Sequence, residues 1–221
     1  MFGKNIFLSV IMAATAFAVC APAQADIIYS NSPNLSSQGG NCVFNTTCGP
    51  EFAGNTFAAQ KFTLGSAATI DEIGFNAIVM GAFATGANWK FLAANGSGGL
   101  PGTVLDSGSG AALTKTAGPT GNSFATTNYS FDIGAITLAA GTYYVAIQEI
   151  TSNFTDYLSF GSAGSGAAQS NDGGTSWASG YQGTNSVAVS LSDVAAVPEP
   201  ASLALLGAGL LGVTLVRRRR A

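Results

Sequence analysis

The feature that most constrains the fold of this chain is a two-residue alternation of apolar and polar side chains. It recurs in several stretches, whose apolar faces comprise Phe62 and Leu64; Ile73, Phe75, Ala77 and Val79; Trp89 and Phe91; Tyr129, Phe131 and Ile133; Tyr143, Val145 and Ile147; and Val187, Val189 and Leu191. Because successive side chains of a β-strand point to opposite faces, this pattern predicts half-buried strands. Glycine-rich breaks separate the strands, and no stretch between them has a helical period. We therefore expect an all-β fold, a single antiparallel β-sandwich or jelly roll at residues 26–196.

Three segments of this region resemble a bacterial surface β-sandwich module. They are IDEIGF (residues 70–75), WKFLAANGSGGLPGTVL (89–105) and YSFDIGAITLAAGTYYVAI (129–147), and the resemblance extends over Thr56 to Leu191. It implies a sandwich fold and a place at the cell surface, and it names no ligand. Within the second segment, Leu100-Pro101-Gly102-Thr103 fits a type II turn, with proline second and glycine third.

The first 25 residues have the three parts of a secretory signal peptide. Lys4 is the positive residue, Ile6–Val19 is the apolar segment, and Ala23-Gln24-Ala25 is a cleavage site of small residues before Asp26. The alternative is an uncleaved membrane anchor, although the apolar run is short for a span. The signal-peptide interpretation implies the Sec translocon and signal peptidase as partners.

Residues 197–221 consist of a proline-containing motif, an apolar segment and a basic cluster. Proline cannot occupy a helix interior, so Pro198-Glu199-Pro200 separates the body from the apolar segment. Residues 201–216 contain no charge and as a helix would extend about 24 Å, slightly less than a hydrocarbon core of about 30 Å. The basic cluster consists of Arg217, Arg218, Arg219 and Arg220, and it favours the cytoplasmic side. We expect a single transmembrane helix that anchors the chain in the inner membrane.

This three-part tail resembles the PEP-CTERM sorting signal of Gram-negative bacteria. The resemblance implies processing by an exosortase, a membrane-embedded cysteine protease, near Pro198, Glu199 and Pro200. The body would then reach the cell surface or the exopolysaccharide outside the cell. The alternative is an ordinary membrane anchor in which the prolines have no sorting role.

Charge and composition exclude several classes of function. Between Asp26 and Glu199, three lysines stand against all 11 acidic residues of the chain, which gives a formal charge of −8. Such a body lacks the basic patch that nucleic-acid binding requires. The chain contains no histidine, which excludes Ser-His-Asp and Cys-His catalysis and histidine-ligated zinc or haem.

Two cysteines, Cys42 and Cys48, remain after signal-peptide cleavage. An exported protein passes through an oxidising compartment, so the sequence predicts a local disulfide between them. The alternative is a redox or metal pair, but two thiolates alone fall short of a metal site.

The segment from Ser170 to Trp177 resembles an Asp box, the S-x-D-x-G-x-x-W hairpin of sialidases and other β-propellers. Ser170, Asp172, Gly174 and Trp177 match its pattern. The resemblance implies that the aspartate ties the turn to backbone N–H groups while the tryptophan packs beneath it. A single copy favours a structural hairpin over a propeller.

Carbohydrate chemistry has two sets of candidate residues. Trp177, Tyr144 and Gln148 could contact a sugar through aromatic faces and an amide, although packing is the commoner role of such aromatics. Glu149 and Asp156 flank a short loop and could form the carboxylate pair of a glycosidase. We predict no catalytic residue, no metal site and no cofactor, with calcium as the alternative because the body is rich in oxygen ligands.

These observations favour a non-enzymatic protein of the cell surface or extracellular matrix, associated with exopolysaccharide and biofilm. The alternative is a secreted carbohydrate-binding module or glycosidase. A sandwich fold alone does not decide between them.

Overall fold

The computed structural model describes residues 26–36, 40–41, 43, 55–80, 83–121, 124–151, 156–162, 165–180 and 186–193. These residues form two antiparallel β-sheets and one short 3-10 turn, η1 (Ser97–Gly99), so the all-β prediction is confirmed. The predicted signal peptide and transmembrane helix lie outside the described residues. Among the described residues, no helix is long and apolar enough to cross a bilayer.

The seven-stranded sheet is built around its long strand β4 (Ala68–Val79). One edge of β4 pairs with β8 (Thr126–Leu138), which in turn pairs with β7 (Thr114–Ala117). The other edge pairs with β13 (Val189–Asp193) and, farther along, with β10 (Asp156–Ser159). The outermost strands on that side are β1 (Asp26–Ser30) beside β13 and β2 (Gly40–Asn41) beside β10.

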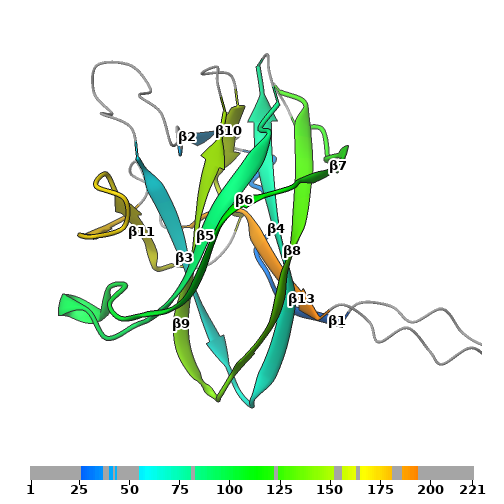
Figure 1. The fold of residues 1–221 in the computed structure, drawn as a ribbon. Coiled ribbons are helices and arrows are strands. Elements are labelled where there is room, and N and C mark those ends of the chain that lie inside the picture. Colours follow the sequence, from blue (N-terminus) through cyan, green and yellow to red (C-terminus); the bar gives the residue numbers. More distant parts are fainter. Residues whose placement is uncertain are drawn as a thin grey trace, which may run out of the picture. The chain divides into compact units, whose positions relative to one another are not determined.

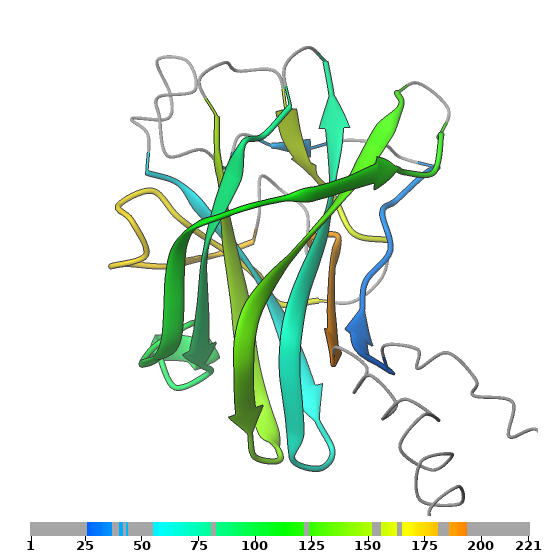
Figure 2. The same cartoon turned by 45° about the vertical axis from the view of Figure 1, so that its right-hand side comes forward.

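The six-stranded sheet has the order β12-β11-β3-β9-β5-β6, so its members come from distant parts of the sequence. Their bounds are β3 (Phe57–Leu64), β5 (Gly86–Ala93), β6 (Val104–Ala111), β9 (Gly141–Ile150), β11 (Ala167–Ser170) and β12 (Ala178–Ser179). Figure 1 shows the two sheets as facing layers, and Figure 2 shows β6 running from one layer toward β7 in the other.

The main core lies between the two sheets, and both supply apolar side chains to it. The six-stranded sheet provides Phe62, Trp89, Phe91, Val145 and Ile147, and the seven-stranded sheet provides Ile73, Phe75, Tyr129, Phe131 and Leu191. Each of these residues was predicted from the alternating pattern to face the core, and each is confirmed there. Ring pairs such as Tyr29 with Phe62, 5.8 Å between centroids, join the layers.

A second apolar cluster lies on the other face of the six-stranded sheet. It consists of Phe57, Ala59, Leu92, Tyr144, Ala146 and Ala168, with Trp177 and Leu100 packed against it. Because both faces of β3, β5 and β9 are covered, these strands carry apolar residues on both faces, more than a strand with one solvent-exposed face would carry.

The predicted type II turn at Leu100–Thr103 is wrong. That turn needs a positive φ at Gly102, whereas the positive φ values occur earlier, at Gly98 (69°) and Gly99 (73°). Gly102 is required for a different reason: a Cβ there would collide with the side chain of Asn95. The Asn95 side chain instead closes the loop, accepting a hydrogen bond from the Thr103 backbone N–H at 2.9 Å.

Candidate functional site

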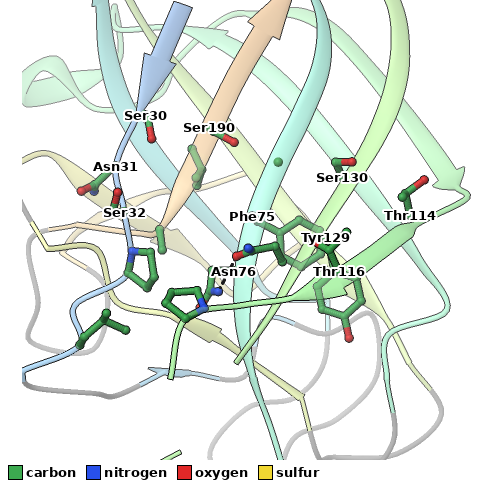
Figure 3. A pocket seen from close by; sticks show the side chains of 17 residues that line it. Ser30, Asn31, Ser32, Phe75, Asn76, Thr114, Thr116, Tyr129, Ser130 and Ser190 are labelled. Atoms are coloured by element: carbon green, nitrogen blue, oxygen red, sulfur yellow. Dashed lines mark hydrogen bonds between the residues drawn. The ribbon is translucent and has the colours of Figure 1, made fainter. Parts of the chain in front are cut away.

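A groove of about 550 Å³ lies on the outer face of the seven-stranded sheet (Figure 3). It crosses five neighbouring strands, β1, β13, β4, β8 and β7. Because Phe75 and Tyr129 turn into the core, the residues next to them, such as Gly74, Asn76 and Ser130, face outward. The alternation that builds the core therefore also sets the lining of this groove.

The strand register aligns the groove residues in two rows. In the first row, Ser30 pairs with Ser190, Ser190 with Gly74, Gly74 with Ser130, and Ser130 with Thr114. Hydroxyl groups thus occupy four of its five positions, and glycine occupies the centre. The Ser190 hydroxyl lies directly over Gly74, where a Cβ would collide with it.

The second row centres on Asn76, which is only 3% exposed. Asn76 pairs with Asn128, which pairs with Thr116. The Asn76 amide donates hydrogen bonds to Asn128 Oδ1 at 2.8 Å and Thr126 Oγ1 at 3.0 Å, and its carbonyl accepts one from Ser159 Oγ at 2.6 Å. All polar atoms of this side chain are therefore satisfied, so Asn76 fixes the base of the groove rather than offering a free group.

The rims of the groove come from two loops. Asn31, Ser32, Pro33 and Leu35 belong to the segment after β1, and Pro119 belongs to the segment after β7. The described lining residues include no acid, lysine or cysteine. The groove therefore offers hydroxyl and amide groups beside a few apolar surfaces, and its described lining holds no carboxylate or lysine that could act as a general acid or base.

Sequence reasoning missed this groove. Its lining residues lie near positions 30, 74, 115, 130 and 190, and only the strand register brings them together. The available signal was local: GFN at residues 74–76, NYS at 128–130 and VSLS at 189–192 place small polar residues on the outward positions of predicted strands.

The Asp-box-like segment forms a hydrogen-bonded turn after β11. The Asp172 carboxylate accepts hydrogen bonds from the backbone N–H groups of Thr175 at 3.0 Å and Ser176 at 2.9 Å. It also accepts one from Ser176 Oγ at 2.6 Å and one from Ser170 Oγ at 2.7 Å. These bonds hold the pKa of Asp172 well below its usual value.

The remaining positions of the motif support the same turn. Gly174 has a φ of 83°, and its N–H donates to Ser170 Oγ at 2.8 Å. Trp177 is half-buried against the second apolar cluster. The arrangement of Ser170, Asp172, Gly174 and Trp177 is that of a structural hairpin packed on the sheet.

Two of the three candidate sugar contacts are buried. Tyr144 is 1% exposed, and its hydroxyl donates to the Gly99 carbonyl at 3.0 Å. Gln148 is 2% exposed and accepts a hydrogen bond from Asn88 Nδ2 at 2.8 Å. A sugar has no access to either side chain in this structure, and a contact through Trp177 stays a prediction.

The two candidate catalytic acids belong to different sheets. Glu149 lies on β9 of the six-stranded sheet opposite Ala87, and Asp156 lies on β10 of the seven-stranded sheet opposite Val79. Glu149 is fully buried, at 0% exposure. A glycosidase pair needs both carboxyl groups in an open cleft, and this placement of Glu149 does not provide one.

Several predicted sites lie outside the described residues: the Cys42–Cys48 disulfide, Pro198, Glu199 and Pro200, and the four arginines at 217–220. They stay predictions from the sequence. Within the part of the chain that the structure describes, no group of three or more acidic, cysteine or histidine side chains could hold a metal ion.

Comparison with known protein families gives a match at the tail of the chain. Residues 196–220 match the family model of the PEP-CTERM protein-sorting motif. No curated protein matches the chain. The match covers the tail with its Pro198-Glu199-Pro200 motif, apolar segment and arginine cluster, and it agrees with the resemblance seen in the sequence. The chain therefore carries a PEP-CTERM sorting motif attached to a β-rich body, which indicates an exported protein that is anchored through this motif before an exosortase processes it.

Proposed function

We propose that this protein is a non-enzymatic component of the cell surface or extracellular matrix of a Gram-negative bacterium, working among exopolysaccharide in a biofilm. The observation that carries the proposal is the sorting motif at residues 196–220, because it directs the body out of the cell. The body's excess of acidic residues over lysines and its all-β architecture suit a protein that stays soluble outside the cell.

The described site chemistry supports a binding or structural role over catalysis. Glu149 is buried and lies in a different sheet from Asp156. Large aromatic side chains, including Tyr129, Tyr144 and Phe91, are fully buried in the two apolar clusters. A carbohydrate-binding module is the second candidate, and the polar groove on the seven-stranded sheet is the observation that favours it.

The sorting part of the proposal is tested by replacing Pro198, Glu199 and Pro200 with alanine in the producing bacterium. Cleavage should stop, so the variant should keep its tail and stay in the inner-membrane fraction. A matched control is Thr137→Val, an exposed position on β8 that should leave delivery unchanged. Immunoblots of inner-membrane, surface and matrix fractions measure the outcome. Delivery of the triple variant like the parent would contradict the proposal.

The matrix part has a separate measurement. The delivered protein should sediment with the exopolysaccharide of its producer and release no reducing sugar from it. Release of reducing sugar by the purified protein would instead identify a glycosidase.

A further inference from the structure

We propose that the groove on the outer face of the seven-stranded sheet binds a neutral oligosaccharide segment. The proposal deepens the function given above and rests on it for the source of the glycan, which is the matrix outside the cell. The binding chemistry itself comes from the groove, and it involves none of the residues Trp177, Tyr144 and Gln148.

The first step is the hydrogen-bonding capacity of the groove. Ser30, Ser190, Ser130 and Thr114 each present a hydroxyl, which donates one hydrogen bond and accepts two. Among the described residues, none of these four hydroxyls takes part in a side-chain hydrogen bond. Because a sugar carries closely spaced hydroxyls that also donate and accept, its hydrogen-bonding pattern complements this row.

The second step is the shape of the groove. Five adjacent strands about 4.8 Å apart make the row about 19 Å long, which accommodates several sugar rings in sequence. Gly74 makes room at the centre of the row for the Ser190 hydroxyl, which lies where a Cβ of residue 74 would stand. Pro33, Leu35 and Pro119 add apolar surface at the rims, which suits the C–H faces of a pyranose ring.

The third step is charge. The described lining is uncharged, and Lys115, which lies on β7 between two lining threonines, has its ammonium 4.7 Å from the ring centroid of Phe83. Glu72 and Asp132 pair with each other two residues along β4 and β8 from the first row. These carboxylates would repel an anionic polymer laid along the groove, so the geometry favours a neutral glycan.

The test uses the full chain purified in mild detergent. An array of neutral glucans, mannans and N-acetylglucosamine oligomers is compared with polygalacturonate and sialylated glycans, and the strongest neutral hit is titrated by calorimetry. We expect saturable binding of a neutral glycan and no binding of the acidic ones. Ser130→Ala combined with Thr114→Val should weaken this binding about tenfold, because both remove hydroxyl groups of the row from the groove.

Two further variants complete the design. Thr137→Val removes an exposed threonine hydroxyl from β8 outside the groove and should leave the affinity unchanged. Ser130→Trp should abolish binding by filling the groove while circular dichroism shows an unchanged β-rich spectrum. The proposal is overturned if no neutral glycan binds, if acidic glycans bind in preference, or if the groove variants bind like the parent.

This outcome is independent of the sorting experiment. Binding in solution does not depend on delivery, and the fractionation of the Pro198, Glu199 and Pro200 variant does not depend on the groove. If the protein binds glycans but does not reach the cell surface or matrix, the proposed function is overturned and the groove proposal is not. If it reaches the surface or matrix but binds no glycan, only the proposal that the groove binds an oligosaccharide is overturned.

Discussion

At the scale of single residues, buried amides organise the polar parts of this fold. Asn76 joins β4 to β8 and β10 through its hydrogen bonds with Asn128, Thr126 and Ser159. Thr126 extends the network by donating to the Pro119 carbonyl at 2.8 Å, which holds one rim of the groove. A buried polar group of this kind is costly only when its partners are lost.

We predict that Asn76→Ala destabilises the protein by about 1–3 kcal/mol, because it leaves buried partners without their hydrogen bonds. Urea unfolding followed by tryptophan fluorescence measures the change. Asn128→Ala is the matched control: Asn128 is exposed and shares only one of these bonds, so its cost should be under about 1 kcal/mol. Equal costs for the two variants would show that the network does not act as described.

Gln60 illustrates what a local pattern cannot predict. It shares the inward face of β3 with Phe62 and is 1% exposed, yet it is polar. Its side-chain carbonyl accepts a hydrogen bond from the Val187 N–H at 2.8 Å, which joins β3 to the segment just before β13. The partner lies 127 residues away, so nothing near Gln60 in the sequence indicates that its burial is compensated. The burial of Tyr144 and Gln148 likewise depends on partners distant in the sequence, the Gly99 carbonyl and the Asn88 amide.

At the scale of elements, the ends of β1, β13 and β4 bring acidic residues together. Asp26 pairs with Asp193 across the β1–β13 ladder. Partial burial raises the pKa of Asp193, and a hydrogen bond to Asp71 and the charges of Asp71 and Asp26 raise it further. The native state therefore binds a proton at Asp193 more tightly than the unfolded chain does, in which the pKa of this carboxyl group has its usual value of 3.8. Stability from this group is highest at low pH and falls as pH rises above 3.8 through the raised pKa.

We accordingly predict that Asp193→Asn is more stable than the parent at pH 7, because the amide carries no charge to be repelled. The gain should shrink as the pH is lowered toward 3.8, where the parent takes up its proton. Thermal unfolding midpoints of both proteins between pH 3 and pH 7 provide the measurement. In an Asp71→Asn background the gain should be smaller, since one source of repulsion is already removed. A gain that does not vary with pH would contradict this account.

The edge elements were the least predictable part of the fold. β7 is exposed at every position and β6 at most of them, so neither has the alternation that identified β4, β8 and β9. β6 is held instead by close approach: Gly108 lies so near the Trp89 indole that a Cβ would be 2.5 Å from Nε1. Strands that bury one face can be predicted from the sequence, whereas strands held by backbone pairing with a neighbouring strand and by close contacts at glycine cannot.

At the scale of the whole molecule, the described body and the sorting tail divide the work between folding and delivery. Every residue of the two apolar clusters lies between Ile28 and Leu191. By contact density, Ala25–Ala195 is one compact unit. The tail's role in delivery could be predicted from sequence because its three parts are contiguous. The groove could not, because its lining is assembled by register across five strands.

This division predicts that deleting residues 197–221 leaves the fold intact. The truncated protein should show the same β-rich circular dichroism and the same urea midpoint as the full chain, because its apolar clusters are complete without the tail. A longer deletion beginning at Ser186 is the control: it removes Val187, Val189 and Leu191 from the core and should abolish cooperative unfolding. If the shorter deletion also unfolds the body, or if its spectrum is dominated by helix, the tail has a structural role that the described core does not account for.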